Sequence, residues 1–254
     1  MPLPRKLITV GLLLGIVAVA GLGAVVTIAR HNTAKPVTVG QAIQRFRAHT
    51  EAPIDTSALP PPGVYSFRTS GDEEVGLPGG HRDLPNTTTI TVAATGCGES
   101  EEWAASTQHS ESRVLCADGD TVRLDSFTSK ISFFGLGSTT TYDCADDAVV
   151  SSQQTRLGEP LSFTCTSDKG GARQTLTEIG YRRLVVGGTR VRALHVHVDA
   201  TLTGANSGTS VQDLWVTVAR SIPVRTEVHT EATSQGVYYT SNYRLDLLDL
   251  EPST

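Results

Sequence analysis

The chain has 254 residues, of which 39% are hydrophobic and 6% aromatic, and its formal net charge is −5. Three of its 21 basic residues lie within the first 30 positions and all 26 acidic residues lie beyond them. The remainder therefore has 18 basic and 26 acidic side chains, a formal charge near −8. This acidic excess argues against nucleic acid as a partner and against electrostatic docking on anionic lipid headgroups.

An uncharged run of 22 residues, positions 7–28, follows Arg5 and Lys6. As a helix it measures about 33 Å, enough to cross a bilayer core of about 30 Å. The basic residues before the run favour a cytoplasmic N-terminus. We therefore expect residues 1–31 to be a cytoplasmic stub and a single-pass signal-anchor in the cell membrane, with the remainder extracytoplasmic. The alternative is a signal peptide cleaved after Ala20, although the apolar run continues for about two helical turns beyond that point. No cysteine lies near the run, so a lipobox is absent.

Residues 32–62 are expected to form a short helix and a proline-rich linker. Thr38 is a suitable N-cap, and the apolar positions after it recur at spacings of three and four: Val39, Ala42, Ile43 and Phe46. This helix either leads away from the membrane or lies against the following domain. Three consecutive prolines, positions 60–62, favour an extended linker over residues 51–63.

From residue 63 to residue 254 the hydrophobic pattern has a period of two, which predicts one extracytoplasmic domain of antiparallel strands. Gly187-Gly188 is typical of a hairpin turn, and short helical pieces are possible only near residues 99–105. The predicted strands are residues 64–68, 87–92, 113–115, 121–124, 130–134, 162–166, 175–186, 190–202, 211–220, 224–231 and 237–247.

In the C-terminal half, one face of each predicted strand is apolar and the other is polar. Such a broad sheet must curl or close to protect its edges, so we expect a mainly β fold: one large curved antiparallel sheet, a half-barrel or barrel-like meander, with one short covering helix. The apolar face lines either a packed core or a ligand cavity. The candidate cavity residues are Leu194, Val196, Val198, Leu214, Val216, Val218, Tyr243 and Leu245.

The four cysteines, Cys97, Cys116, Cys144 and Cys165, all lie in the part expected outside the membrane. An even number in an oxidising compartment predicts two disulfides. Three pairings are possible. We favour Cys97–Cys116 and Cys144–Cys165, because each pair brackets one short stretch of a chain of hairpins.

His195 and His197 share one strand face with Asp199, which makes them weak candidates for a zinc site or a metal-dependent enzyme. Their more ordinary interpretation is a solvated strand face. Acidic pairs such as Glu101 with Glu102 lie in hydrophilic stretches, where we expect them to be solvated and to have ordinary acidity. Glycine pairs fit turns, and none precedes a helix that could hold a phosphate. The sequence therefore predicts no catalytic residue and no cofactor.

Several segments resemble uncharacterised actinobacterial membrane-anchored envelope proteins: Pro62-Gly63-Val64-Tyr65, Gly96-Cys97-Gly98, Asp213-Leu214-Trp215, and Tyr243-Arg244-Leu245-Asp246-Leu247 with Pro252. The C-terminal meander also resembles the half-barrel of LolA-like lipoprotein carriers. That resemblance implies a curved sheet and covering helices around a lipid-binding cavity.

These observations favour a non-enzymatic, membrane-anchored β domain that binds a hydrophobic envelope ligand or a protein partner. The alternative is a structural or scaffold module of a cell-envelope assembly. A metal-dependent enzyme based on His195 and His197 is a weaker alternative. A continuous apolar cavity of roughly 300 Å³ or more favours ligand binding, and a filled core argues against it.

Overall fold

The structure is a computed structural model that describes residues 32–50, 59–152, 154–234 and 236–254. The predicted membrane segment, residues 7–28, and the alternative cleavage after Ala20 lie outside the described residues. In the described ranges, no helix is both long enough and apolar enough to cross a membrane.

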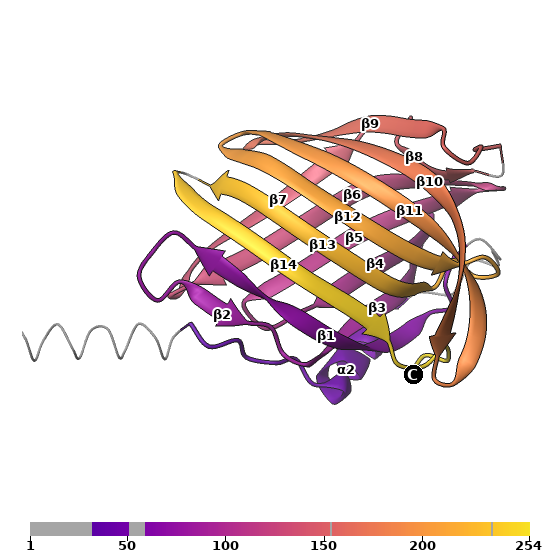
Figure 1. The fold of residues 1–254 in the computed structure, drawn as a ribbon, viewed down its shortest axis with the longest axis horizontal. Helices are drawn as coiled ribbons and strands as arrows, with labels where there is room; N and C mark the ends of the chain where they lie inside the picture. The colour runs from indigo at the N-terminus through magenta and orange to yellow at the C-terminus, as the bar shows by residue number, and fades with distance from the viewer. Residues whose placement is uncertain (1–31, 51–58, 153, 235) are drawn as a thin grey trace, which may run out of the picture.

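Twelve antiparallel strands form a closed barrel (Figure 1). Around the ring they are β1 (Gly63–Val75), β3 (Thr87–Thr95), β4 (Gly98–Ala104), β5 (His109–Asp118), β6 (Thr121–Phe133), β7 (Leu136–Cys144), β9 (Pro160–Ser167), β10 (Gly170–Val186), β11 (Thr189–Gly204), β12 (Asn206–Thr217), β13 (Pro223–Ser234) and β14 (Val237–Leu247). Two short strands lie outside the ring: β2 (His81–Asp83) pairs with β1, and β8 (Val149–Ser152) pairs with β6.

The barrel closes because β14 pairs with β1, from Phe67 opposite Leu247 to Val75 opposite Tyr239. Closure satisfies the backbone groups that the edges of an open sheet would leave unpaired. The mainly β, antiparallel prediction is confirmed, and its barrel-like form is the one observed. Gly187 and Gly188 both have positive φ and form the predicted two-residue turn between β10 and β11. A short helical piece was expected to be possible near residues 99–105, and that expectation is wrong, because residues 99–104 belong to β4.

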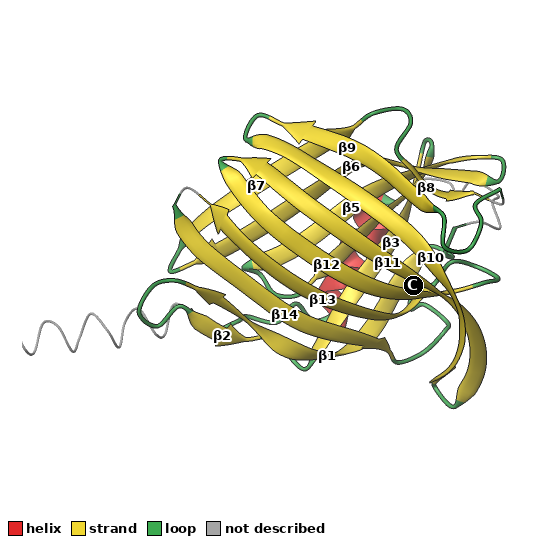
Figure 2. Cartoon of the chain, turned by 45° about the horizontal axis from the view of Figure 1, so that its top comes forward, coloured by secondary structure: helices red, strands yellow, loops and turns green. Residues whose placement is uncertain are grey.

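The single helix among the described residues, α2 (Val39–His49), lies on the outer wall of the barrel (Figure 2). Thr38 caps it as predicted, and Gln41 completes a capping box. Its apolar residues Ala42 and Phe46 pack on Val64 of β1 and on Ala93 of β3. The predicted helix therefore exists and docks on the domain, but it does not cover the concave face of an open sheet.

The two ends of the barrel differ in the turns they carry. We call the end with the β1–β2, β6–β7 and β13–β14 turns the proximal end, and the end with the β10–β11 and β12–β13 turns the distal end (Figure 1). Asn32 is fixed at the proximal end, where its side-chain amide donates to the carbonyls of Gly79 and His81. The chain then passes α2 on the outer wall, and Leu59 packs into the barrel beside Leu115.

Candidate ligand cavity

Side chains along each strand alternate between the lumen of the barrel and its outer wall. Leu194 pairs with Val216 and Val196 with Leu214, so these side chains share the inner face of β11 and β12. They line a cavity of about 690 Å³. Seven of the eight residues that the sequence picked out contribute to this lining: Leu194, Val196, Val198, Leu214, Val216, Tyr243 and Leu245.

The eighth residue, Val218, lies outside the cavity lining and is largely exposed. Strand β12 ends at Thr217, and a register shift between Trp215 and Val216 interrupts the pairing with β13 just before it. The alternation that would have turned Val218 inward therefore does not continue to this position.

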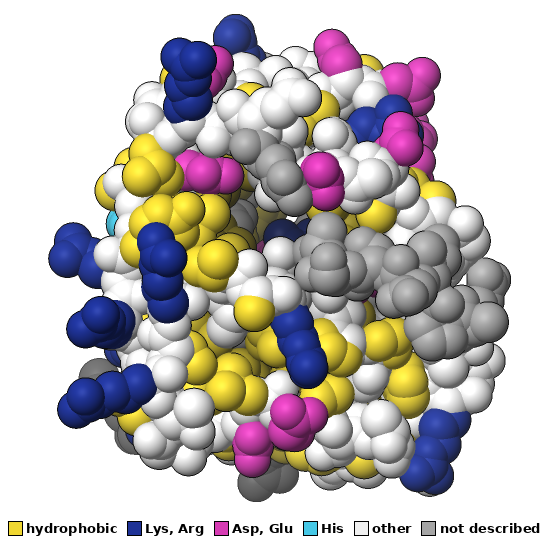
Figure 3. Space-filling view, turned by 90° about the vertical axis from the view of Figure 1, so that its right-hand side faces the viewer, with side chains coloured by type: hydrophobic (Ala, Val, Ile, Leu, Met, Phe, Trp, Pro, Cys, Tyr) yellow, Lys and Arg dark blue, Asp and Glu magenta, His cyan; other side chains and the backbone are white. Residues whose placement is uncertain are grey.

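The lumen is packed on one side and hollow on the other. Tyr65, Phe67, Trp103 and Leu247 are buried in one hydrophobic cluster beside β1, β3 and β14. By contrast, Leu194, Val196 and Leu214 face inward but remain partly exposed, as residues around a void must. Figure 3 views the distal end and shows hydrophobic side chains around a central hollow. At 690 Å³ the cavity is within the range of about 300–1,000 Å³ that is typical of small-molecule sites.

A strip of ionisable side chains faces the cavity from β4 and β5. Glu101 lies opposite Arg113 across the two strands, and Arg113 Nε donates to Glu101 Oε2 at 2.6 Å. The Arg113 Nη2 atom lies 2.5 Å from the same oxygen. The Arg113 side chain is nevertheless 38% exposed, and because it lines the cavity, this exposed surface belongs to the lumen. Its remaining N–H groups are thus available to a cavity ligand.

Glu99 lies two residues before Glu101 on the same strand face and is only 2% exposed. Burial is the main cause that raises the pKa of its carboxyl to about 9, the charge of Glu101 raises it further, and Arg113 lowers it. Glu99 is therefore a neutral acid at pH 7. Among the described residues, its Oε1 atom has no hydrogen-bond partner. The cavity thus combines apolar side chains with two lining residues that have an unsatisfied polar atom, Glu99 and Ser241, and with a partly free guanidinium.

A second buried group of ionisable residues lies near the proximal end: Glu73 of β1, Arg82 of β2 and His109 of β5. His109 Nδ1 hydrogen-bonds Glu73, and Arg82 Nε donates to Glu73 Oε2 at 2.7 Å. Burial alone would raise the pKa of Glu73, but His109 and Arg82 lower it. Burial alone would likewise lower the pKa of His109, but Glu73 and Glu111 raise it to about 9. The Glu73 and His109 side chains are almost wholly buried, so this charged network joins strands rather than meeting a substrate.

His195 and His197 lie on the outer wall and point away from the cavity. Both rings hydrogen-bond Asp213 Oδ1 of the neighbouring strand, at 2.6 and 3.0 Å, and His195 stacks on Trp215. Burial alone would raise the pKa of Asp213, but hydrogen bonds from His197 and His195 lower it. In the described part of the chain, no group of three histidine, cysteine or acidic side chains is arranged to hold a metal ion.

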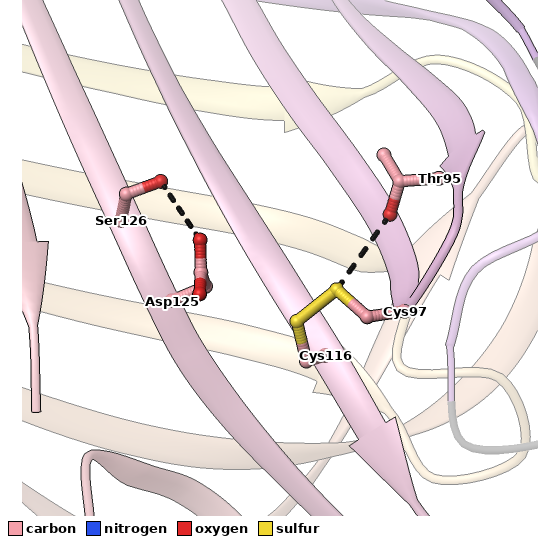
Figure 4. Close-up of a disulfide and its surroundings, with 5 residues drawn as sticks. All are labelled: Thr95, Cys97, Cys116, Asp125 and Ser126. Atoms are coloured by element: carbon pink, nitrogen blue, oxygen red, sulfur yellow. Dashed lines mark hydrogen bonds between the residues drawn. A yellow bond between two sulfur atoms is a disulfide. The ribbon is translucent and has the colours of Figure 1, made fainter. Parts of the chain in front are cut away.

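Both predicted disulfides are present. Cys97–Cys116 joins the β3–β4 turn to β5, and Figure 4 shows it beside Thr95. Cys144–Cys165 joins β7 to β9, the two neighbouring strands of the barrel that share the fewest residue pairs. Only two residue pairs link these strands, and one of them is Cys144 with Cys165. We call this junction the β7–β9 seam.

The charged strip was not predicted from the sequence. Glu101 was expected to be solvated together with Glu102, but Glu101 faces the lumen and only Glu102 points outward. The alternation Glu99, Glu101, Trp103 on one face was visible in the sequence. Because the inward face of a strand is normally apolar, the acidic residues on this face indicated a solvated surface instead of a lumen-facing one.

Comparison with known proteins gives little guidance. No protein-family model matches the sequence, and no curated protein matches it significantly. Among solved structures, the crystal structure of the hypothetical lipoprotein YmcC from Escherichia coli (K12) is similar over 84% of this chain and 90% of that chain. The sequence identity is 10% and the TM-score is 0.35.

Proposed function

We propose that this protein is a non-enzymatic binding protein that holds an amphipathic, lipid-like molecule inside its barrel. The observation that carries the proposal is the hollow lumen of about 690 Å³, with an apolar wall centred on the inward residues of β11 and a strip of ionisable residues on β4 and β5. A scaffold module needs no such void, because a packed core is more stable than a hollow one.

The apolar wall supplies affinity and the polar strip supplies orientation. Each methylene group buried from water contributes about 0.8 kcal/mol, so about ten of them contribute about 8 kcal/mol. A free energy of this size corresponds to a dissociation constant of about 1 μM, before the costs of binding are counted. A hydroxyl, amide or carboxylate oxygen on the ligand can accept a hydrogen bond from the exposed part of Arg113.

The proposal includes the anchor that the sequence predicts. Residues 7–28 hold the protein in the cell membrane, and the barrel lies on the extracytoplasmic side. The two disulfides support this location, because such bonds persist in oxidising compartments.

Neighbouring positions on β11 with opposite orientations allow a matched test. Val196 lines the cavity, whereas His197 is on the outer wall. Full-length protein should bind a fluorescent long-chain fatty acid with a stoichiometry of one. Val196→Trp should weaken binding at least tenfold by filling the lumen, and His197→Trp should leave it unchanged. No saturable binding by the wild type, or equal effects of the two substitutions, contradicts the proposal.

A further inference from the structure

A hydrophobic edge borders the cavity at the proximal end, on the side of the β1–β2, β6–β7 and β13–β14 turns. We call it the apolar rim; it consists of Leu77, Phe134, Leu136, Val237 and Tyr238. Four of these residues also line the cavity, all except Tyr238. Leu136 is 79% exposed and Leu77 is 48% exposed, so the rim presents apolar surface directly to its surroundings.

The rim is one continuous feature although its residues come from three turns. The Gly76 amide donates to the carbonyl of Tyr238, which places the β1–β2 and β13–β14 turns side by side. Phe133 packs in a cluster with Val75 and Tyr239, which brings the β6–β7 turn to the same mouth. Arg82 reinforces this junction, because its guanidinium lies 3.9 Å from the centre of the Phe133 ring and donates to the carbonyl of Ser132.

Phe134 is held in the rim at a cost. Its φ of 56° is in the left-handed region, where a bulky side chain is disfavoured by about 1–3 kcal/mol. Gly135, with φ 81°, completes a two-residue turn of the kind that usually contains glycine or asparagine. The strained residue, Phe134, is thus an aromatic side chain that lines the cavity at the proximal end.

The start of the described chain lies at the same end of the barrel as the rim. Asn32 is fixed to Gly79 and His81, within the turn that carries Leu77. The uncharged run ends at Ile28, only four residues earlier, and four residues reach at most about 14 Å. An anchor in the bilayer therefore keeps the proximal end against the bilayer surface.

We infer that the apolar rim inserts into the outer surface of the membrane that holds the anchor, so that lipid-like ligands pass between the bilayer and the lumen without crossing water. This inference rests on the proposed anchor and deepens the proposed function. Exposed leucine and aromatic side chains are the residue types that bury into the interface of a bilayer. The residues of the two rim turns 76–80 and 134–137 carry no charge that would oppose insertion.

Depth-dependent quenching tests the inference on full-length protein in phosphatidylcholine vesicles. All four native cysteines are paired, so a single introduced cysteine is the only free thiol. A fluorophore on Leu136→Cys should be quenched by phosphatidylcholine that carries a nitroxide on its acyl chain. The matched control is Val185→Cys, an exposed position on the distal β10–β11 hairpin, where quenching should be absent.

Three outcomes overturn the inference: protein that does not float with the vesicles, a label at position 136 that is not quenched, or equal quenching at position 185. Ligand binding is measured separately, by titration with the fatty acid. Quenching at position 136 without ligand binding therefore leaves the membrane contact intact and refutes only the proposed function.

A transfer assay adds a functional readout. Leu77→Ser combined with Leu136→Ser should slow the transfer of a fluorescent fatty acid from vesicles to the protein at least fivefold, and a separate titration with the fatty acid in the absence of vesicles measures any change in affinity, because both residues also line the cavity. Val185→Ser should transfer at the wild-type rate. An unchanged transfer rate in the double variant contradicts a role of the rim in loading.

Discussion

Replacing Cys144 and Cys165 together by alanine should destabilise the barrel more than replacing Cys97 and Cys116. The two disulfides close loops of similar length, with sequence separations of 21 and 19 residues. Loop-closure entropy in the unfolded chain therefore gives each bond about 3 kcal/mol, with a difference of only about 0.1 kcal/mol. Any larger difference must come from the folded state.

The folded state does differ at the two sites. Beside Cys97–Cys116, strands β4 and β5 are joined by seven residue pairs, whereas β7 and β9 share only two. Next to this seam, Lys169 reaches across from the β9–β10 turn and donates to the carbonyl of Thr139 at 2.7 Å. Without the disulfide, only the pair Asp143 with Thr166, worth roughly 0.2–1 kcal/mol relative to an alanine pair, is left to hold β7 and β9 together. We expect them to fray, at an added cost of about 1–2 kcal/mol.

Thermal unfolding and hydrogen exchange measure this difference. With about 2–4 °C per kcal/mol for a protein of this size, losing the roughly 3 kcal/mol of Cys97–Cys116 should lower the Tm by roughly 6–12 °C. Losing Cys144–Cys165 should lower it by a further 2–8 °C and should speed amide exchange in β7 and β9. Equal shifts in Tm for the two variants, with unchanged exchange at the seam, would show that β7 and β9 hold together without their disulfide.

Three further predictions concern the ionisable residues. Because burial raises the pKa of Glu99 to about 9, the folded protein retains a proton that the unfolded chain releases above pH 4.5. The stability of the protein should therefore fall as the pH rises from about 4.5 to 9. Glu99→Gln should flatten this decline in Tm, and a decline as steep as in the wild type would show that Glu99 is ionised. Arg113→Met leaves the buried Glu101 carboxylate without its partner and should lower the free energy of unfolding by up to about 3 kcal/mol, measured by denaturant titration. Adding Glu101→Gln to this variant should recover part of the lost stability. No recovery would contradict the pairing of Glu101 with Arg113. Replacing His195 and His197 by alanine should change stability by less than about 1 kcal/mol, and elemental analysis of the purified protein should detect no stoichiometric zinc; one zinc per chain in the wild type would revive the metal interpretation.

The elements that the sequence predicts best are those with local signals. The Gly187-Gly188 turn, the Thr38-capped helix and the strand at residues 237–247 all depend on neighbouring residues, and each is present as expected. The inner face of β11 and β12 was also predictable, because apolar and polar residues alternate there without interruption.

Other features depend on contacts that no local pattern encodes. Closure of the barrel joins β1 to β14, so Phe67 pairs with Leu247, 180 residues away. Strand β4 was missed because its inward residues include Glu99 and Glu101, which are acceptable inside only because the lumen is a partly polar cavity. The hollow itself could not be predicted, because the same inward side chains could equally have packed against one another.

The most direct test of a ligand-holding barrel is to find where a bound lipid lies. Full-length protein in phosphatidylcholine vesicles is irradiated with a fatty acid that carries a photoactivatable group on its chain, and the labelled residues are mapped by mass spectrometry. A lipid held in the lumen should label inward residues of the cavity wall, such as Leu194, Val196 and Leu214, and these labels should be lost in Val196→Trp. Labels confined to the outer wall, on His195 or on α2, would contradict it.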